Sequence, residues 1–185
     1  GSNTLTITAD EVTATVEVKV AESVVAAVSN SAGIIGAEDN STGWWTVFSD
    51  NFNVPAGETR SISFTNCTRQ ANTSGSNFAI VLRKADLAEY AVVRADNYGW
   101  GAGYDGNASL VHNGTQGDWA AWLADMNGAK VTVYVTNCGN GIAHIQAVMK
   151  GTSGTSYAQY YLGINKLDMN DLNFALTIEG GHLVF

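Results

Sequence analysis

Apolar and polar residues alternate with a period of two through much of the chain. From Val12 to Val20, valine or alanine occupies every second position, with threonine, glutamate and lysine between them. This alternation is typical of β-strands with one buried face. The other apolar positions that follow it are Phe78, Ile80 and Leu82; Val131, Val133 and Val135; Ala143, Ile145, Ala147 and Met149; Ala158, Tyr160 and Leu162; and Leu172, Phe174, Leu176 and Ile178.

Clusters rich in Gly, Asn and Ser separate these segments, among them TSGS, GNG and GTSGT, and they indicate tight turns. Helical spacing occurs from Asp118 to Asn127, where Asp118 would cap a short helix that carries Trp119, Trp122, Leu123 and Met126. No internal repeat or linker interrupts the pattern. The sequence therefore predicts one all-β domain over residues 1–185, an antiparallel β-sandwich of jelly-roll type with one short helix. Gly1 and Ser2 are interpreted as a cloning remnant.

Charge narrows the class of partner. Seventeen acidic residues against nine basic ones give a net charge of −8, which repels phosphate backbones and anionic membrane surfaces. We therefore expect neither nucleic acid nor a membrane as partner, and no apolar run has the length of a membrane span. Charged residues make up only 14 %, while Thr, Ser, Asn and Gly are plentiful, which favours a secreted or cell-surface protein.

The polar positions of the late strands predict an outer sheet face that carries tyrosine, amide and imidazole groups without Lys or Glu. Aromatic rings stack on the apolar face of a pyranose, and amides or imidazoles hydrogen-bond its hydroxyls, so this face suits a neutral sugar. The alternative is a solvated face that carries these residues for β-propensity alone. The predicted members are Tyr134, His144, Gln146, Tyr157, Gln159 and Tyr161.

Aromatic residues outside these strands add further candidates for ligand contact. Tyr98 and Trp100 stand among glycines in YGWG, where a loop-borne ring serves either as a ligand platform or as a plug at the end of the fold. Trp44 and Trp45 are adjacent, so in a strand they would point to opposite faces. One should then be buried beside Phe48 and the other free to face a ligand, and which is which stays open.

Motifs of nucleophilic, phosphate or metal chemistry are missing from the sequence, so we predict no catalytic residue, metal ligand or cofactor. The loop aspartates Asp39, Asp50, Asp96 and Asp105 leave a structural calcium open, although their spacing matches no calcium loop.

The two cysteines, Cys67 in FTNCT and Cys138 in VTNCG, each follow a predicted strand end. They could meet across a sheet edge as a disulfide or remain two buried thiols, and both alternatives stay open.

An enzyme alternative is a small jelly-roll glycoside hydrolase that uses Glu89 in LAEYAVV and Glu179 in TIEGG, phrases that faintly resemble the small secreted xylanases. A retaining enzyme of this kind needs its two carboxyl groups roughly 5 Å apart. Both glutamates fall at predicted strand ends, where exposure alone explains them.

The segments GWWTVFSDNFNVPAGETRSISFTN and EYAVVRADNYGWGAGYDG resemble the non-catalytic carbohydrate-binding modules attached to cellulases and xylanases of gut and rumen bacteria. The later DWAAWLADMNGAKVTVYVTN and LNFALTIEGGHLVF fit the same pattern, so the resemblance covers Gly43 to Phe185. Cys67 departs from it, because an aromatic residue is more usual there.

The resemblance implies a monomeric β-sandwich module that holds a larger, multi-domain bacterial glycoside hydrolase on plant cell-wall polysaccharide, such as β-glucan, xyloglucan or xylan. It also implies a cleft on one sheet, lined by the tyrosine, glutamine and histidine side chains, with Trp100 at its edge. The non-enzymatic alternative is a surface adhesin or structural sandwich domain that binds protein, which would present a larger apolar patch.

Overall fold

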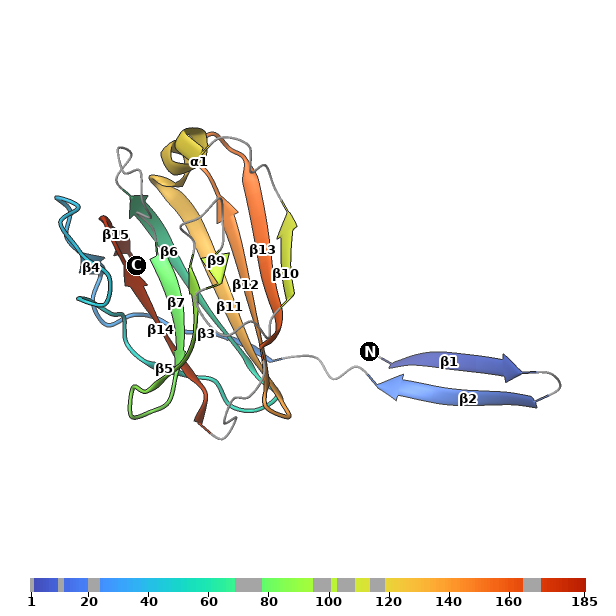
Figure 1. Cartoon of the computed structure of the whole chain (residues 1–185). Helices are drawn as coiled ribbons and strands as arrows, with labels where there is room; N and C mark the ends of the chain where they lie inside the picture. Colours follow the sequence, from blue (N-terminus) through green and yellow to red (C-terminus); the bar gives the residue numbers. More distant parts are fainter. Residues whose placement is uncertain are drawn as a thin grey trace.

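Two β-sheets pack face to face over a shared apolar core in the computed structural model of the chain (Figure 1). The structure describes residues 2–9, 12–19, 24–68, 78–94, 101–102, 109–113, 119–164 and 171–185. This arrangement confirms the prediction of an all-β sandwich with one short helix.

The larger sheet, called the large sheet below, has the strand order β10-β13-β12-β11-β6-β15-β4, and β3 pairs in parallel with β6 beside this path. Its strands are β3 (Val25–Ala27), β4 (Ile34–Gly36), β6 (Thr59–Thr68), β10 (Ser109–Asn113), β11 (Ala129–Gly139), β12 (Ile142–Lys150), β13 (Ser156–Ile164) and β15 (Gly181–Val184).

The other sheet, called the small sheet, has the order β5-β14-β7-β8-β9. Its strands are β5 (Phe52–Asn53), β7 (Phe78–Arg83), β8 (Glu89–Arg94), β9 (Gly101–Ala102) and β14 (Asn173–Ile178). All of its described pairings are antiparallel, and β14 joins the sheet between β5 and β7, from which it is distant along the chain.

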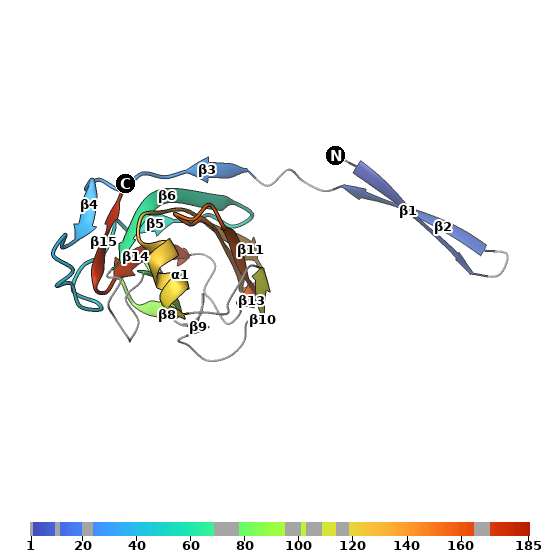
Figure 2. The ribbon, with the colours of Figure 1, turned by 90° about the horizontal axis from the view of Figure 1, so that it is seen from above.

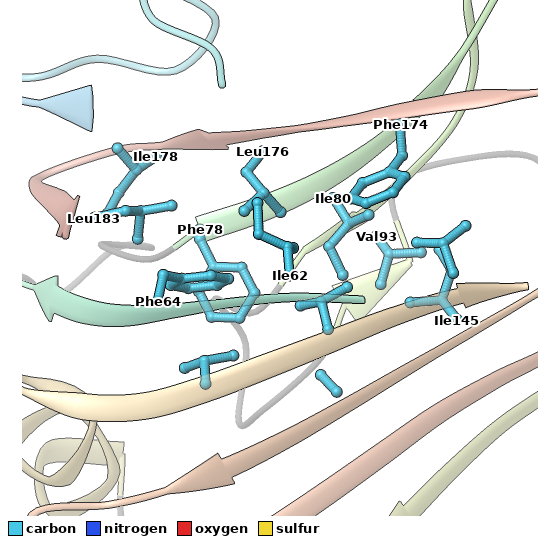
Figure 3. Close-up of a cluster of buried hydrophobic side chains, with 14 of the residues drawn as sticks. Ile62, Phe64, Phe78, Ile80, Val93, Ile145, Phe174, Leu176, Ile178 and Leu183 are labelled. Atoms are coloured by element: carbon cyan, nitrogen blue, oxygen red, sulfur yellow. The ribbon is translucent and has the colours of Figure 1, made fainter. Parts of the chain in front are cut away.

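The alternating residues of β11 and β12 point into the sandwich as the sequence predicts. The inward apolar residues, Ala129 to Val135 on β11 and Ala143 to Met149 on β12 at every second position, are at most 1 % exposed. Strands β14 and β7 supply the opposing side chains, including Phe174 and Ile80 (Figure 3). Phe64 of the large sheet meets Phe78 of the small sheet edge to face, with ring centroids 5.1 Å apart. Aromatic pairs favour this geometry because the positive ring edge faces the negative ring plane.

Strand β13 has the opposite phase from the prediction. Its register pairs Tyr157 with Met149 and Tyr160 with Gln146, so Tyr157 is buried in the core while Tyr160 faces outward and is half-buried. The predictions of a core Tyr160 and an outward Tyr157 are therefore wrong. Tyrosines occupy both odd and even positions of this strand, so its sequence does not show which side faces the core. The hydrogen-bonded pairing with β12 determines that side.

The outer face of the small sheet is covered by the chain itself. All six residues of β7 are buried, because Trp44 and Phe48 pack on an outer cluster of Ala79, Val81 and Val92. Three hydrogen bonds to β14 hold the covering segment. Ser49 N–H donates to the Leu176 carbonyl at 2.9 Å, Leu176 N–H donates to the Ser49 hydroxyl oxygen at 2.8 Å, and the Thr177 hydroxyl donates to the Val47 carbonyl at 2.7 Å.

Helix α1 (Trp119–Met126) confirms the predicted helix and lies at one end of the sandwich (Figures 1 and 2). Leu123 and Met126 are at most 2 % exposed, so one side of the helix closes this end of the core. Gly128 then takes a left-handed φ of 99° and donates its N–H to the Asn66 carbonyl at 2.7 Å, which returns the chain to the sheet. Among the described helices, none has the length and apolar character needed to cross a bilayer.

Strands β1 (Ser2–Ala9) and β2 (Val12–Lys19) pair with each other and stand apart from both larger sheets (Figures 1 and 2). The strand predicted from Val12 is confirmed up to Lys19. That the whole chain forms a single domain stays a prediction.

Candidate functional site

A row of polar and aromatic side chains crosses the outer face of the large sheet. Register places Tyr134 of β11 beside Gln146 of β12, and Gln146 beside Tyr160 of β13. On the other side of Tyr134 the row continues to Ser61 of β6. With neighbouring strands about 4.8 Å apart, the row extends over roughly 14 Å. The amide Nε2 of Gln146 donates to the Tyr160 hydroxyl at 3.3 Å, which orients both groups.

A second row lies beside it, formed by Thr59, Thr136 and His144. The hydroxyls of Thr59 and Thr136 share a hydrogen bond of 2.8 Å. The Gly163 backbone N–H donates to His144 Nδ1 at 2.9 Å, at an irregularity in the β12–β13 pairing. A neutral imidazole whose Nδ1 accepts carries its proton on Nε2, so His144 keeps one donor for a ligand.

The two rows line a hollow of about 370 Å³, within the usual size range of small-ligand sites. Among the described residues that line it, none is Lys, Arg, Asp or Glu. The hollow combines two phenol rings with amide, imidazole and hydroxyl groups, so it can offer stacking surfaces together with both donors and acceptors. We call it the Tyr–Gln hollow; its described lining is Val25, Thr59, Tyr134, Thr136, His144, Ile145, Gln146 and Tyr160.

Three of the predicted residues, Tyr134, His144 and Gln146, thus come together. Tyr157 does not join them. It points into the core, and its hydroxyl donates at 2.5 Å to the buried carboxylate of Asp125, a residue of α1. For Gln159 and Tyr161 the backbone pairs with Ala147 and Ile145, and their side chains lie outside the described part of the structure. Tyr98 and Trp100 also fall outside the described residues.

Sequence reasoning missed Tyr160, although the turn between β12 and β13 carried the signal. The five residues GTSGT from Gly151 to Thr155 pair Lys150 with Ser156. In an antiparallel hairpin this loop length fixes every later pair, so Gln146 must face Tyr160. Counting back from the turn would have placed Tyr160 on the outer face.

Trp44 and Trp45 belong to the other sheet. They lie in a turn rather than a strand, and Trp45 has a left-handed φ of 60°. Trp44 packs with Phe48 on the small sheet, whereas Trp45 is 40 % exposed. The expected neighbour of Phe48 is thus Trp44 and the exposed ring is Trp45, but Trp44 is half-buried rather than buried, and the expected strand is wrong. The structure does not bring these rings to the Tyr–Gln hollow.

The buried Asp125 links the end of α1 to the β12–β13 turn. It accepts hydrogen bonds from the Tyr157 hydroxyl and from the Ser153 N–H, the latter at 2.6 Å. Burial alone would raise the pKa of Asp125, but these bonds outweigh it and lower the pKa below the ordinary value. Burial and the adjacent carboxylate raise the pKa of Tyr157 to about 12. This pair stabilises the end of the sandwich where α1 meets the β12–β13 turn.

The cysteines do not meet. Both are free and half-buried, and burial raises the pKa of each thiol. The pairings of Asn66 with Ala129 and of Thr59 with Thr136 place them at opposite ends of β6 and β11, roughly 30 Å apart. A disulfide requires Cα atoms within about 7 Å, so the two-thiol alternative holds.

The glutamates of the hydrolase alternative are also apart. Glu89 pairs with Arg83 at one end of β7, while Glu179 follows Ile178, which pairs with Phe78 at the other end. Five residues of strand put more than about 15 Å between their backbones. Hydrolysing carboxyl groups lie at most roughly 9.5 Å apart, so these two side chains would have to turn toward each other along β7 to act together, and the hydrolase alternative stays a prediction.

Metal ligands do not gather within the part of the chain that the structure describes, where no three His, Cys, Asp or Glu residues form a candidate site. Asp50 is occupied by the Ser31 N–H at 2.6 Å, and Asp39 accepts the Ser41 N–H at 3.0 Å. Asp96 and Asp105, the other aspartates considered for calcium, lie outside the described residues.

Comparison of the chain with protein-family models, with curated proteins and with solved structures found no match. The arguments for its function therefore rest on the geometry above.

Proposed function

We propose that the chain is a non-catalytic carbohydrate-binding module that holds an attached glycoside hydrolase on plant cell-wall polysaccharide, with the Tyr–Gln hollow as its binding site. The observation that carries the proposal is the row of Tyr134, Gln146 and Tyr160, which are in register on adjacent strands and line a hollow whose described residues carry no charge. A sugar chain lying along this row meets two rings separated by an amide. Each ring offers an apolar face to the axial C–H groups, and the amide serves the hydroxyl rim.

The electrostatics of the hollow favour a neutral glycan. A neutral sugar gains nothing from a charged wall, and burying a charge against it would cost desolvation energy. The net charge of −8 further disfavours polyuronates and other anionic polymers. β-Glucan, xyloglucan and xylan fit these requirements. A secreted or cell-surface location in a bacterium belongs to the same proposal.

Affinity electrophoresis tests the proposal. The protein is run in native gels that contain xyloglucan, mixed-linkage glucan, hydroxyethylcellulose, xylan or mannan. We expect retardation in one or two of these gels, because a hollow of defined shape selects among backbones. A stacked ring contributes about 1 kcal/mol, so Tyr134→Ala should weaken binding about fivefold, and Gln146→Ala should act in the same direction.

Val148→Ala provides the matched control, because Val148 lies on the same outer face at 39 % exposure but outside the described lining of the hollow. It should leave retardation unchanged. Mobility that no glycan reduces would contradict carbohydrate binding and favour a domain that binds protein.

A further inference from the structure

The exposed indole of Trp45 is held in place by a carboxylate from another strand. Its Nε1–H donates to Glu89 Oε1 at 2.6 Å, across forty-four residues of sequence. Glu89 begins β8 and is itself exposed. This bond fixes the plane of an aromatic ring that is 40 % exposed, and a fixed ring is a better stacking surface than a rotating one because no rotamer freedom is lost on binding.

The backbone beneath this ring is in an unfavourable conformation. Trp45 has φ 60°, a region that residues with a Cβ rarely adopt. The turn that imposes it is closed by the Thr46 hydroxyl, which donates to the Gly43 carbonyl at 2.7 Å. Bulky residues in this region often belong to binding sites, where the surrounding structure maintains the strain.

Trp44 supports the platform from behind. Its ring centroid lies 5.6 Å from that of Trp45, at an interplanar angle of 58°, and its other side packs on the outer cluster of the small sheet. Trp44 is thus part of the packing, whereas Trp45 presents its surface to solvent. The two adjacent tryptophans therefore have different roles, one in stability and one available for contact.

We propose that Trp45 and Glu89 form a second carbohydrate-binding site, which stacks one pyranose ring of a neutral glycan on the indole and accepts its hydroxyl protons on the carboxylate. The Trp45 hydrogen bond uses Oε1 of Glu89 and leaves Oε2 for the sugar. Uronic acids are disfavoured, because their carboxylates would meet the exposed Glu89 and the overall negative charge, whereas the Arg83 guanidinium that interacts with Glu89 is buried.

This inference goes beyond the proposed function because the platform lies on the opposite sheet from the Tyr–Gln hollow, so each site can fail without the other. Two sites on opposite faces let one module contact two glycan chains, or one chain at two points. Such bivalency raises retention on an insoluble polymer without any new contact.

Nuclear magnetic resonance on the full chain reads both sites in one titration. The Trp45 indole N–H reports on the platform, and the Gln146 side-chain amide reports on the hollow. The sugars are cellohexaose, xylohexaose and mannohexaose, with hexagalacturonic acid as the charged counterpart. Trp45→Phe assigns the indole signal. We expect at least one neutral hexasaccharide to shift the Trp45 signal saturably, and hexagalacturonic acid to leave it in place.

Substitutions separate ligand contact from folding. Trp45→Ala should weaken binding at the platform about fivefold. Glu89→Ala keeps the indole ring but removes both the carboxylate that holds it and the acceptor for the sugar hydroxyls. It should therefore weaken sugar binding at the platform, and it serves as the second test if Trp45→Ala does not fold. Leu87→Ala is the matched control, because Leu87 is 56 % exposed, also has a left-handed φ, and precedes the same strand. Urea denaturation of each variant shows whether a loss of binding follows from unfolding.

The outcomes distinguish the two proposals. Shifts at Gln146 but not at Trp45 overturn the second site and leave the proposed function standing. Shifts at Trp45 alone support the second site and contradict the hollow as the binding site. If none of the three neutral sugars shifts the Trp45 or the Gln146 signal, both binding sites are overturned.

Discussion

The outer faces of the two sheets differ in what covers them. On the small sheet, Ala79 and Val81 point outward yet are fully buried, because Trp44 and Phe48 pack over them. On the large sheet, Tyr134 and Gln146 point outward and line a hollow that is open to solvent. The small sheet therefore has core on both sides, and the large sheet has it on one.

This difference explains the composition of the strands. Strand β7 reads FAIVLR, which is apolar at both parities, as expected of a strand buried on two faces. Strands β11 and β12 alternate, as expected of strands with one solvated face. A strand that is apolar at both parities thus indicates that another part of the chain covers its outer face. An alternating strand with aromatic and amide residues on its polar side indicates a face available for contact with a ligand.

A buried charge gives the largest test of this comparison. Val81→Asp places a carboxylate beneath Trp44 and Phe48. The buried Arg83 guanidinium, which lies over the Phe48 ring on the same side of β7, offsets part of its desolvation cost, so the fold should lose about 3 kcal/mol of stability. The matched Val148→Asp on the open face should cost less than about 1 kcal/mol. Midpoints of urea unfolding measure both. Equal losses of stability in the two variants would show that the outer faces of the two sheets are equally exposed to solvent.

Alkaline titration tests the inward side of β13. The pKa of Tyr157 is raised to about 12 in the folded chain, against about 10 when unfolded. Above pH 10 the unfolded state loses this proton while the folded state retains it, so stability falls as pH rises from 10 to 12. The loss should approach about 2–3 kcal/mol. Urea unfolding at pH 9, 10 and 11 checks it, and Tyr157→Phe should remove this part of the slope.

Two tyrosines three residues apart mark the boundary between core and open face. Tyr157→Phe leaves Asp125 without one of its hydrogen bonds and should cost about 1.5–3 kcal/mol of stability with glycan binding unchanged. Tyr160→Phe should change stability by less than about 0.5 kcal/mol. It should nevertheless weaken glycan binding, because Gln146 loses the hydroxyl that orients it. Thermal unfolding and affinity electrophoresis separate the two effects. If Tyr160→Phe lost stability and Tyr157→Phe lost glycan binding, Tyr160 would be the inward residue of β13 and Tyr157 the outward one.

Reduction should have the smallest effect. Cys67 and Cys138 are free thiols at opposite ends of neighbouring strands. A reductant should therefore leave the midpoint of thermal unfolding unchanged, and a thiol assay of the unfolded chain should count two groups. A drop in the midpoint on reduction would mean that the two strands do not pair in this register.

The site could be predicted where one strand carries a single, unbroken alternation. Tyr134, His144 and Gln146 lie between small or branched apolar residues, so their direction follows from period alone. The prediction failed at β13, where Tyr157, Tyr160 and Tyr161 occupy both parities and only the five-residue turn carries the register. It was incomplete at Trp44 and Trp45, because a turn with a left-handed residue does not obey strand alternation.

The sequence by itself determined the all-β class, the short helix, the main core positions and the low charge of the outer face, because these follow from local periodicity and composition. Tertiary structure decided which tyrosine of β13 faces the hollow, that the cysteines stay apart, and that Trp45 stands opposite Glu89 on a different sheet from Gln146. These outcomes depend on strand register and on contacts between residues distant along the chain. A period of two describes one strand, and it contains no information about which strand lies beside it.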